Sequence, residues 1–302
     1  MMPVVLWTDA LIFLLTAVVV LFVLYARRKP HIRTPWQRVF SGRIAATSVV
    51  VLLAFIIIGL LDSLHFRLSL AVNGNSDETH YSVEVLSVLD VLLGPVKTQV
   101  EKTYSAPFAT HLFAKETIEL ADGTQVRDYP RLLYGGRHLT DDGAGKWRDI
   151  LQRSLLALLQ TFMTGAVIFY SAAVLLGRRA NRDSKSMLRA MLARQTLLPW
   201  RTMLTTVTLV VFLVLLVVNL AGAYHVFGTD KVGQDVLYLT LKSIRTGLVI
   251  GTLTTLIMLP FAVFLGIVAG YARGWTDDVV QYVYTTLNSI PGVLLIAASI
   301  LM

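Results

Sequence analysis

The stretch "TMLTTVTLVVFLVLLVVNLAGAY" at residues 202–224 contains no Asp, Glu, Lys or Arg. A helix needs roughly 20 predominantly apolar residues to cross a hydrocarbon core about 30 Å thick. The stretch therefore predicts a membrane-spanning helix. The whole chain has the same character, since 55% of its 302 residues are hydrophobic and only 15% are charged, which is far more apolar than an average soluble domain.

Five further apolar stretches predict membrane spans, at residues 3–25, 44–61, 154–177, 246–271 and 279–302. Asp9 is the only charged residue within these six stretches. An ionisable residue inside a span is a functional candidate, but Asp9 lies within two turns of the end of its stretch, which favours an interfacial position over a proton relay. The sequence thus predicts an all-α polytopic membrane protein with about six transmembrane helices.

The formal net charge of +8 is concentrated in two short connecting segments. Residues 26–43 hold six Lys/Arg and no acid, and residues 178–201 hold seven with one Asp. Both segments fall on the same side of an alternating topology, so the positive-inside rule places them in the cytoplasm and the N-terminus outside. Because the cations lie in membrane loops, no nucleic-acid partner is predicted.

Residues 62–153 form the only large polar region, with thirteen acids and ten bases, and they are predicted to lie outside the cytoplasm. This region is too long for a simple loop, so we expect a small α+β extracytoplasmic domain. Within it, residues 82–95 predict a short amphipathic helix that stops at Gly94 and Pro95, and residues 117–129 predict a β-hairpin around Asp122 and Gly123. The predicted domain limits are 1–61, 62–153, 154–201 and 202–302.

No pattern for catalysis or cofactor binding is visible. Residues 133–138, "LYGGRH", lack the GxxxxGK[ST] pattern of a nucleotide-binding loop, and no GxSxG nucleophile pattern occurs. The absence of Cys excludes disulfides and thiolate metal sites. The remaining metal candidates have no ligand pairing at helical spacing, which favours ordinary solvated residues. These candidates are His65, His80, His111 and His138, with Asp77, Glu78, Asp141 and Asp142.

Residues 225–248, "HVFGTDKVGQDVLYLTLKSIRTGL", interrupt the apolar runs with a polar cluster. A helix from Asp230 to Arg245 would have successive residues 100° apart, so that its polar residues share one arc. That arc would contain Gln234, Asp235, Tyr238, Lys242 and Arg245. We expect Gly228, Thr229 and Asp230 to form a turn and helix cap before it. Thr246 and Gly247 would mark a bend into the next span, so composition alone favours a surface helix that links two spans.

The same stretch, with the residues that follow it, resembles the inner-membrane permease subunits of dipeptide, oligopeptide and nickel ABC importers, specifically the second of their two permease chains. Those proteins carry "HPLGTDxLGRDVLSR", then a span ending in "G-x-x-AGY-x-GGW-x-D", then a helix broken by "S-[FI]-P". The matching residues are His225, Gly228, Thr229, Asp230, Gly233, Asp235 and Val236, then Gly266, Ala269, Gly270, Tyr271, Gly274, Trp275 and Asp277, then Ser289 and Pro291. The resemblance covers 225–302, with 202–224 as the first permease helix.

Several features depart from the family pattern. The Arg of "LGRDV" is Gln234 here, and the charged "MR-x-x-D" pattern after the Trp is replaced by Gln281, Tyr282 and Thr285, which puts charge-dependent gating there in doubt. The family's cytoplasmic "EAA-x3-G" loop, which docks onto the ATPase, would lie beyond Met302, so we expect a truncated sequence. Residues 1–201 are expected to be an N-terminal extension.

The resemblance implies a pore-forming subunit, not an enzyme, in a bacterial inner membrane, which moves peptides or a similar small solute. Its implied partners are a second permease subunit, two ATP-binding subunits that hold ATP and Mg, and an extracytoplasmic substrate-binding protein. Residues 228–245 would contact that binding protein or guard the pore entrance. Gly266 and Gly270 would allow close helix contact, and Pro291 would act as a hinge. The alternative is a membrane sensor or assembly protein whose outer domain binds a ligand or partner.

Overall fold

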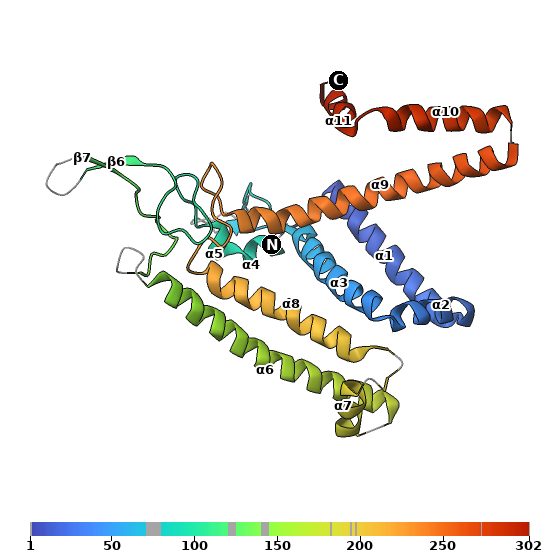
Figure 1. Cartoon of the computed structure of the whole chain (residues 1–302), viewed down its shortest axis with the longest axis horizontal. Helices are drawn as coiled ribbons and strands as arrows, with labels where there is room; N and C mark the ends of the chain where they lie inside the picture. The colour runs from blue at the N-terminus through green and yellow to red at the C-terminus, as the bar shows by residue number, and fades with distance from the viewer. Residues whose placement is uncertain are drawn as a thin grey trace. The chain divides into compact units, whose positions relative to one another are not determined.

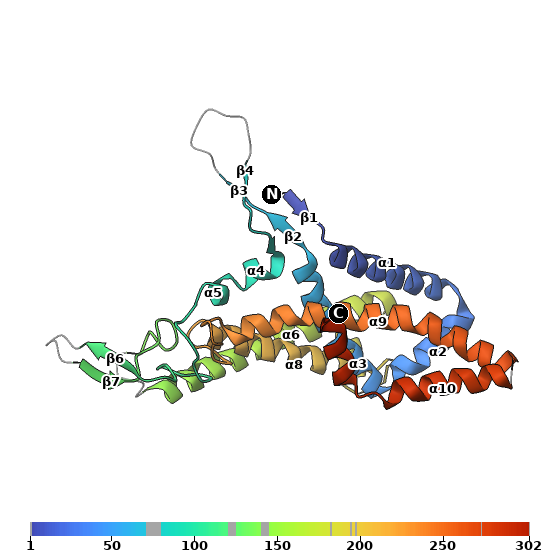
Figure 2. The same cartoon turned by 90° about the horizontal axis from the view of Figure 1, so that it is seen from above.

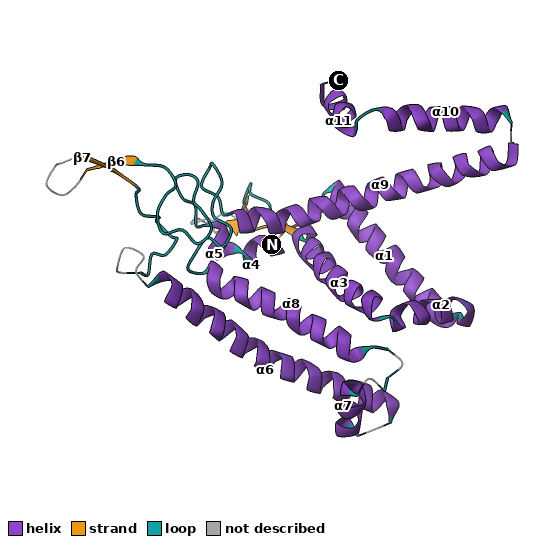
Figure 3. Ribbon diagram, viewed as in Figure 1, coloured by secondary structure: helices purple, strands orange, loops and turns teal. Residues whose placement is uncertain are grey.

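A computed structural model describes residues 2–70, 80–119, 125–139, 145–181, 183–193, 195–196, 198–272 and 274–301. The chain forms two compact units, Met1–Thr246 and Gly247–Met302 (Figure 1). Helices make up most of both units, as Figure 3 shows. The predicted limits at 61, 153 and 201 stay predictions.

The longest helices of the first unit coincide with the apolar stretches of the sequence, and shorter helices lie between them. In chain order, the helices are α1 (Trp7–Arg28), α2 (Pro30–Ser41), α3 (Arg43–Ser63), α4 (Val88–Leu92), α5 (Gly94–Lys97), α6 (Lys146–Ala180), α7 (Ser184–Leu192) and α8 (Trp200–Ala221). Helix α9 (Val236–Ala272) begins in this unit and continues into the second. Within the described residues, α1, α3, α6, α8 and α9 are each long and apolar enough to cross a membrane. The polypeptide is therefore a multi-pass α-helical membrane protein, as predicted.

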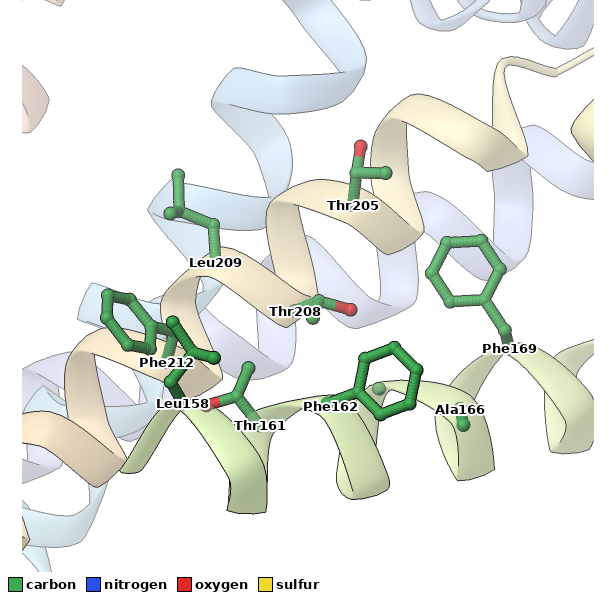
Figure 4. A pocket seen from close by; sticks show the side chains of 10 residues that line it. Leu158, Thr161, Phe162, Ala166, Phe169, Thr205, Thr208, Leu209 and Phe212 are labelled. Atoms are coloured by element: carbon green, nitrogen blue, oxygen red, sulfur yellow. The ribbon is translucent and has the colours of Figure 1, made fainter. Parts of the chain in front are cut away.

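Helices α6 and α8 lie side by side because small residues recur along one face of α6 (Figure 1). The buried residues of that face are four or eight positions apart: Ala157, Thr161, Gly165, Ala173 and Gly177. A Cβ on Gly165 would lie 2.9 Å from Thr208 Cγ2, so this glycine lets α8 approach closely. Phe162, Phe169 and Phe212 line an open apolar groove of about 520 Å³ along the same pair (Figure 4).

Among the described residues, strands between α3 and α6 form three small antiparallel sheets, one of which is completed by a strand that precedes α1. In the first, β2 (His65–Arg67) lies between β1 (Met2–Val4) and β5 (Leu86–Ser87), with Met2 opposite Arg67. Figure 2 shows β1 and β2 side by side. The second pairs β3 (Ser69–Leu70) with β4 (His80–Tyr81). The third pairs β6 (Glu116–Glu119) with β7 (Gln125–Asp128), which confirms the predicted hairpin, although Asp122 and Gly123 lie outside the described residues.

The helix predicted over 82–95 is wrong in its extent. Residues 82–85 lie in a loop, Leu86 and Ser87 form β5, and only α4 and α5 are helical. Ser87 and Asp90 form a capping box that starts α4, since Ser87 Oγ accepts from the Asp90 amide at 3.0 Å and Asp90 Oδ2 accepts from the Ser87 amide at 2.9 Å. Gly94 and Pro95 do not stop the helical segment. They occupy the start of α5, where Pro is tolerated because its missing N–H is not needed.

The second unit consists of the rest of α9 followed by α10 (Trp275–Ser289) and α11 (Gly292–Leu301). The predicted span 279–302 is two helices, because the chain bends by 84° between α10 and α11, where Pro291 cannot donate a helical hydrogen bond. A role for this break as a hinge stays a prediction. So does close packing at Gly266 and Gly270, where an added Cβ would meet no atom within 4 Å.

The two basic segments lie at the same end of the first unit's long helices, as the alternating topology requires. Helix α2 joins the end of α1 to the start of α3, and α7 joins the end of α6 to the start of α8 (Figure 1). The opposite ends carry the strands and the loop after α8. This arrangement agrees with a single cytoplasmic face for both segments, which stays a prediction.

We expect an impermeant maleimide to label Val83→Cys in intact cells, whereas Ser184→Cys should react only after permeabilisation. Val83 is 91% exposed in the strand-bearing region, and Ser184 begins α7 in a basic segment. The chain contains no native Cys, so each signal comes from one position. Labelling of Ser184→Cys in intact cells would reverse the predicted topology.

Candidate functional site at the 225–235 loop and the start of α9

The polar stretch after α8 is a loop rather than the start of a helix. Helix α9 begins at Val236, so the helix predicted from Asp230 is wrong at its N-terminal end. Gly228 and Gly233 have φ values of +74° and +82°. Residues that carry a side chain rarely adopt such values, and a right-handed α-helix does not contain them. The Asp230 carboxylate accepts from the amides of Val232 and Gln234 at 2.9 Å, so it caps a tight turn within the loop.

Both glycines are required because residues 101–108 pass directly over this 225–235 loop. A Cβ on Gly233 would overlap the carbonyl oxygen of Glu101, and one on Gly228 would overlap the carbonyl oxygen of Ser105. The Glu101 amide donates to the Gly233 carbonyl at 2.9 Å. Thr229, which is only 4% exposed, donates its hydroxyl to the Thr103 carbonyl at 2.8 Å. The loop is therefore shaped to hold this segment.

His225 lies at the centre of the contact and is fully buried. Its Nδ1 lies 2.7 Å from Asp235 Oδ2, and its Nε2 lies 3.3 Å from Glu101 Oε1. The Glu101 carboxylate also accepts backbone N–H groups, from Leu133 at 2.9 Å, Tyr134 at 2.8 Å and Gly135 at 3.2 Å. The second oxygen of Asp235 accepts from the Leu237 amide at 2.8 Å and caps α9. Every polar atom of the imidazole thus has an acidic partner.

The two carboxylates keep His225 protonated. Burial alone would lower the pKa of His225, but the hydrogen bonds to Asp235 and Glu101 outweigh it and raise the pKa from 6.5 to about 9. Burial would likewise raise the pKa of Glu101. The hydrogen bonds from His225 and three backbone amides lower it from 4.5 to about 2 instead. His225 is therefore an imidazolium at neutral pH, with both ring nitrogens donating.

A second ion-pair group involves the next turns of α9. Tyr238 donates its hydroxyl to Asp90 Oδ1 at 2.8 Å, and Lys242 Nζ donates to both Asp90 oxygens at 3.0 and 3.1 Å. Lys242 also lies 2.9 Å from Asp62 Oδ1, which accepts from the Ser87 hydroxyl. Burial would raise the pKa of Asp90, but the Ser87 amide, Lys242 and Tyr238 lower it to about 2. This group joins α9 to the ends of α3 and β5 and to α4.

A third group follows at Arg245, whose guanidinium donates to Asp9 Oδ1 and, at 2.8 Å, to the Thr8 hydroxyl. The other Asp9 oxygen lies 2.9 Å from His65 Nδ1 and accepts from the Leu6 amide at 3.1 Å. Asp9 is fully buried in the first turn of α1, so it serves as an ion-pair partner at that helix end. Helix α9 is thereby joined to α1 and β2.

Most residues of the predicted polar arc do share one face, but that face packs against the rest of the first unit and not against solvent. Asp235, Tyr238, Lys242 and Arg245 recur at helical spacing along one face of α9, and each bonds to an acidic or basic group elsewhere in residues 1–225. Of the predicted arc only Gln234, in the loop, is exposed. The bend at Thr246 and Gly247 is wrong, because α9 runs through both residues. Contact of residues 228–245 with a binding protein stays a prediction.

The acidic partners were not identified as site residues from the sequence. Glu101, Asp62 and Asp90 are separated from their α9 or loop partners by more than a hundred residues. One signal was available, since the pair Ser87 and Asp90 fits a capping box. Among the described residues no group of three His, Cys, Asp or Glu side chains is arranged to hold a metal ion. The candidates Asp77, Glu78, Asp141 and Asp142 lie outside those residues.

The site combines a glycine-dependent loop, a buried imidazolium and a helix whose first turns are ion-paired to the preceding chain. No protein-family model matches the chain, and no solved structure matches it at a significant level. The oligopeptide transport system permease protein OppC of Mycobacterium bovis is 34% identical over 76 residues, which are 25% of this chain and 26% of the relative.

The glutathione transport system permease protein GsiD of Pectobacterium atrosepticum is 32% identical over 74 residues, 24% of this chain and 25% of the relative. The dipeptide transport system permease protein DppC of Bacillus subtilis is 35% identical over 75 residues, 25% of this chain and 23% of the relative. About a quarter of this chain is similar to peptide transport permeases. The resemblance drawn from the motifs is thereby confirmed, and the chain spans about a quarter of the length of the curated relatives it matches.

Proposed function

We propose that this membrane protein is a pore-forming subunit of an ABC importer that moves peptides or a similar small solute across a bacterial inner membrane. The observation that carries the proposal is the similarity of about 75 residues to three peptide transport permeases. The several apolar helices of the described chain support it, because a translocation path needs a helical bundle. The chain itself would catalyse no reaction.

The energy for transport would come from two partner subunits that bind ATP and Mg. Residues 133–138 lack a phosphate-binding pattern, so nucleotide binding is assigned to those partners. A second permease subunit would complete the pore, and a substrate-binding protein would deliver the solute outside. ATP binding would then shift the bundle between inward-open and outward-open packings, with each state favoured by its own set of contacts.

The departures from the family pattern lie in the parts that such a switch would use. Gln234 is exposed at the loop, where the family has an arginine, and Tyr282 is 73% exposed on α10. We therefore propose that any gating at these positions does not rely on charge. The break at Pro291 would provide the flexible point within the bundle.

Deletion of the gene in its source bacterium should reduce uptake of radiolabelled peptides to the level of non-mediated entry. A panel of dipeptides, glutathione and longer peptides would identify the substrate class, and a plasmid copy of the gene should restore uptake. Glucose uptake serves as the control for general damage to the membrane. If peptide uptake is unchanged while another membrane response is lost, the importer assignment is wrong and a sensor or assembly role replaces it.

A further inference from the structure

Helix α2 occupies an unusual place, between two apolar helices at the predicted cytoplasmic end of the first unit. One extended residue on each side, Lys29 and Gly42, separates it from α1 and α3. Both neighbours are long and apolar enough to cross a membrane, so their shared end lies at a membrane surface. Figure 1 shows α2 crossing from the end of α1 to the start of α3. Its connections to α1 and α3 are therefore enough to hold α2 at that surface.

The residues of α2 are divided between an apolar and a polar side. At 100° per residue, the apolar side chains fall within an arc about 100° wide, with Arg33 at the edge of this arc and Arg38 on the opposite, polar side of the helix. These apolar residues are Ile32, Trp36, Val39 and Phe40. Trp36 stacks on Phe40 with ring centroids 5.6 Å apart and meets Phe22 of α1 edge-on. Even so, Trp36 remains 45% exposed and Val39 remains 53% exposed.

The second basic segment provides a direct comparison. Its helix α7 also has an apolar side, but Met187 and Met191 are buried there against Ala173 of α6 and Leu204 of α8. Protein buries Met187 and Met191 of α7, although Leu192 at the end of that helix remains 46% exposed, whereas the described part of the chain covers Trp36 and Val39 of α2 only partly. The two helices occupy the same end of the first unit, so their exposure differs by packing rather than by location.

In the part of the chain that the structure describes, the charges around α2 have no acidic partner. Six Lys/Arg lie between residues 26 and 43 with no acid, and in the described residues none of them forms an ion pair. A signal for membrane orientation needs only the number of such charges. It does not need an amphipathic helix with an exposed tryptophan. The combination of cations, an aromatic cluster and an apolar arc is instead that of a helix lying in the membrane interface.

We propose that α2 is a binding surface for anionic phospholipids. Its apolar arc enters the boundary between headgroups and acyl chains, where amphipathic helices and tryptophan side chains are stable. Arg33, at the edge of that arc, and Arg38, on the polar side of the helix, donate to the phosphates of phosphatidylglycerol or another anionic lipid. Lipid is the occupant that the structure supports, because α1 and α3 hold α2 at the bilayer surface and its charge is complementary to that surface.

Fluorescence quenching by brominated lipids tests this assignment on the full chain. The chain has five Trp, and a variant that keeps only Trp36, with the others changed to Phe, is reconstituted in phosphatidylcholine vesicles. Brominated phosphatidylglycerol should quench Trp36 more strongly than brominated phosphatidylcholine at the same mole fraction. The Arg33→Gln/Arg38→Gln change should remove that preference. The expected loss of relative affinity for the anionic lipid is up to about fivefold per arginine. High salt should also weaken it.

The matched control is Lys185→Gln/Arg189→Gln in α7, which removes the same charge at the same end of the first unit and should leave the preference intact. Both α2 arginines are exposed, so their replacement removes no core contact. No quenching of Trp36 by either lipid would show that protein or water covers α2. Equal quenching by both lipids, or an equal loss in the α7 control, would show that α2 recognises no headgroup. Any of these three results overturns the proposal.

Discussion

Replacing Gly233 with alanine should destabilise the first unit by about 3 kcal/mol or more, because overpacking and backbone strain act together at this position. A Cβ there would overlap the Glu101 carbonyl oxygen, and the residue has a φ of +82°. Neither neighbour can move away easily, since the Glu101 amide donates to the Gly233 carbonyl. The midpoint of thermal unfolding of the detergent-solubilised chain should fall by roughly 6–12 °C.

Gly145→Ala provides the control for this measurement. Gly145 precedes α6 with a negative φ, and an added Cβ there would meet no atom within 4 Å. Its substitution should change the midpoint little. Gly228→Ala should resemble Gly233→Ala, because its Cβ would overlap the Ser105 carbonyl oxygen. Equal midpoints for Gly145→Ala and Gly233→Ala would contradict the docking of residues 101–108 on the loop.

The stability of the first unit should decrease by about 3 kcal/mol as the pH rises from 6.5 to 9, and His225 should be responsible. Its pKa is 6.5 ordinarily and about 9 when folded, so the folded state binds a proton that the unfolded state releases in this range. The contribution is complete below pH 6.5 and lost as the pH passes 9. For Glu101, whose folded pKa is about 2, the contribution is complete above pH 4.5 and lost as the pH falls through 2.

His225→Gln isolates this effect. The variant leaves Glu101 and Asp235 buried without a cation, which should cost about 3–5 kcal/mol at pH 6.5. It should also lose most of the decrease between pH 6.5 and 9, which unfolding midpoints at several pH values would measure. His31→Gln, at an exposed position of α2, is the control and should retain the wild-type slope. A His225→Gln slope equal to that of the wild type would show that another group titrates in this range.

The sequence was most informative where one local property determines the structure. Apolar length predicted the helices α1, α3, α6 and α8, because a span needs little besides continuous hydrophobicity. Helical periodicity also grouped Asp235, Tyr238, Lys242 and Arg245 correctly, although the start of the helix was placed too early. The wrong start of the helix did not change which residues share a face, because the spacing of 100° per residue is the same wherever the helix begins.

The parts that could not be predicted depend on contacts between distant residues. Gly228 and Gly233 adopt positive φ where residues 101–108 pack directly against them. The sequence around the two glycines does not indicate which segment packs there. The inward direction of the polar arc has the same origin. Lys242 appears solvent-facing until Asp62 and Asp90, more than 150 residues away, are placed beside it. A pattern along the chain shows which residues share a face, but not what covers that face.

The contact between the 225–235 loop and residues 101–108 is made largely through the main chain. Besides the Glu101 carboxylate, which binds His225, and the Ser105 hydroxyl, which accepts from Thr229, the segment offers the carbonyls of Glu101, Thr103 and Ser105, which every amino acid supplies. Exposed side chains in the segment, such as Lys102 and Tyr104, take no part in it. The segment is therefore free to mutate at Lys102 and Tyr104 while its docking persists, so the sequence signature on this side is limited to side chains such as Glu101 and Ser105.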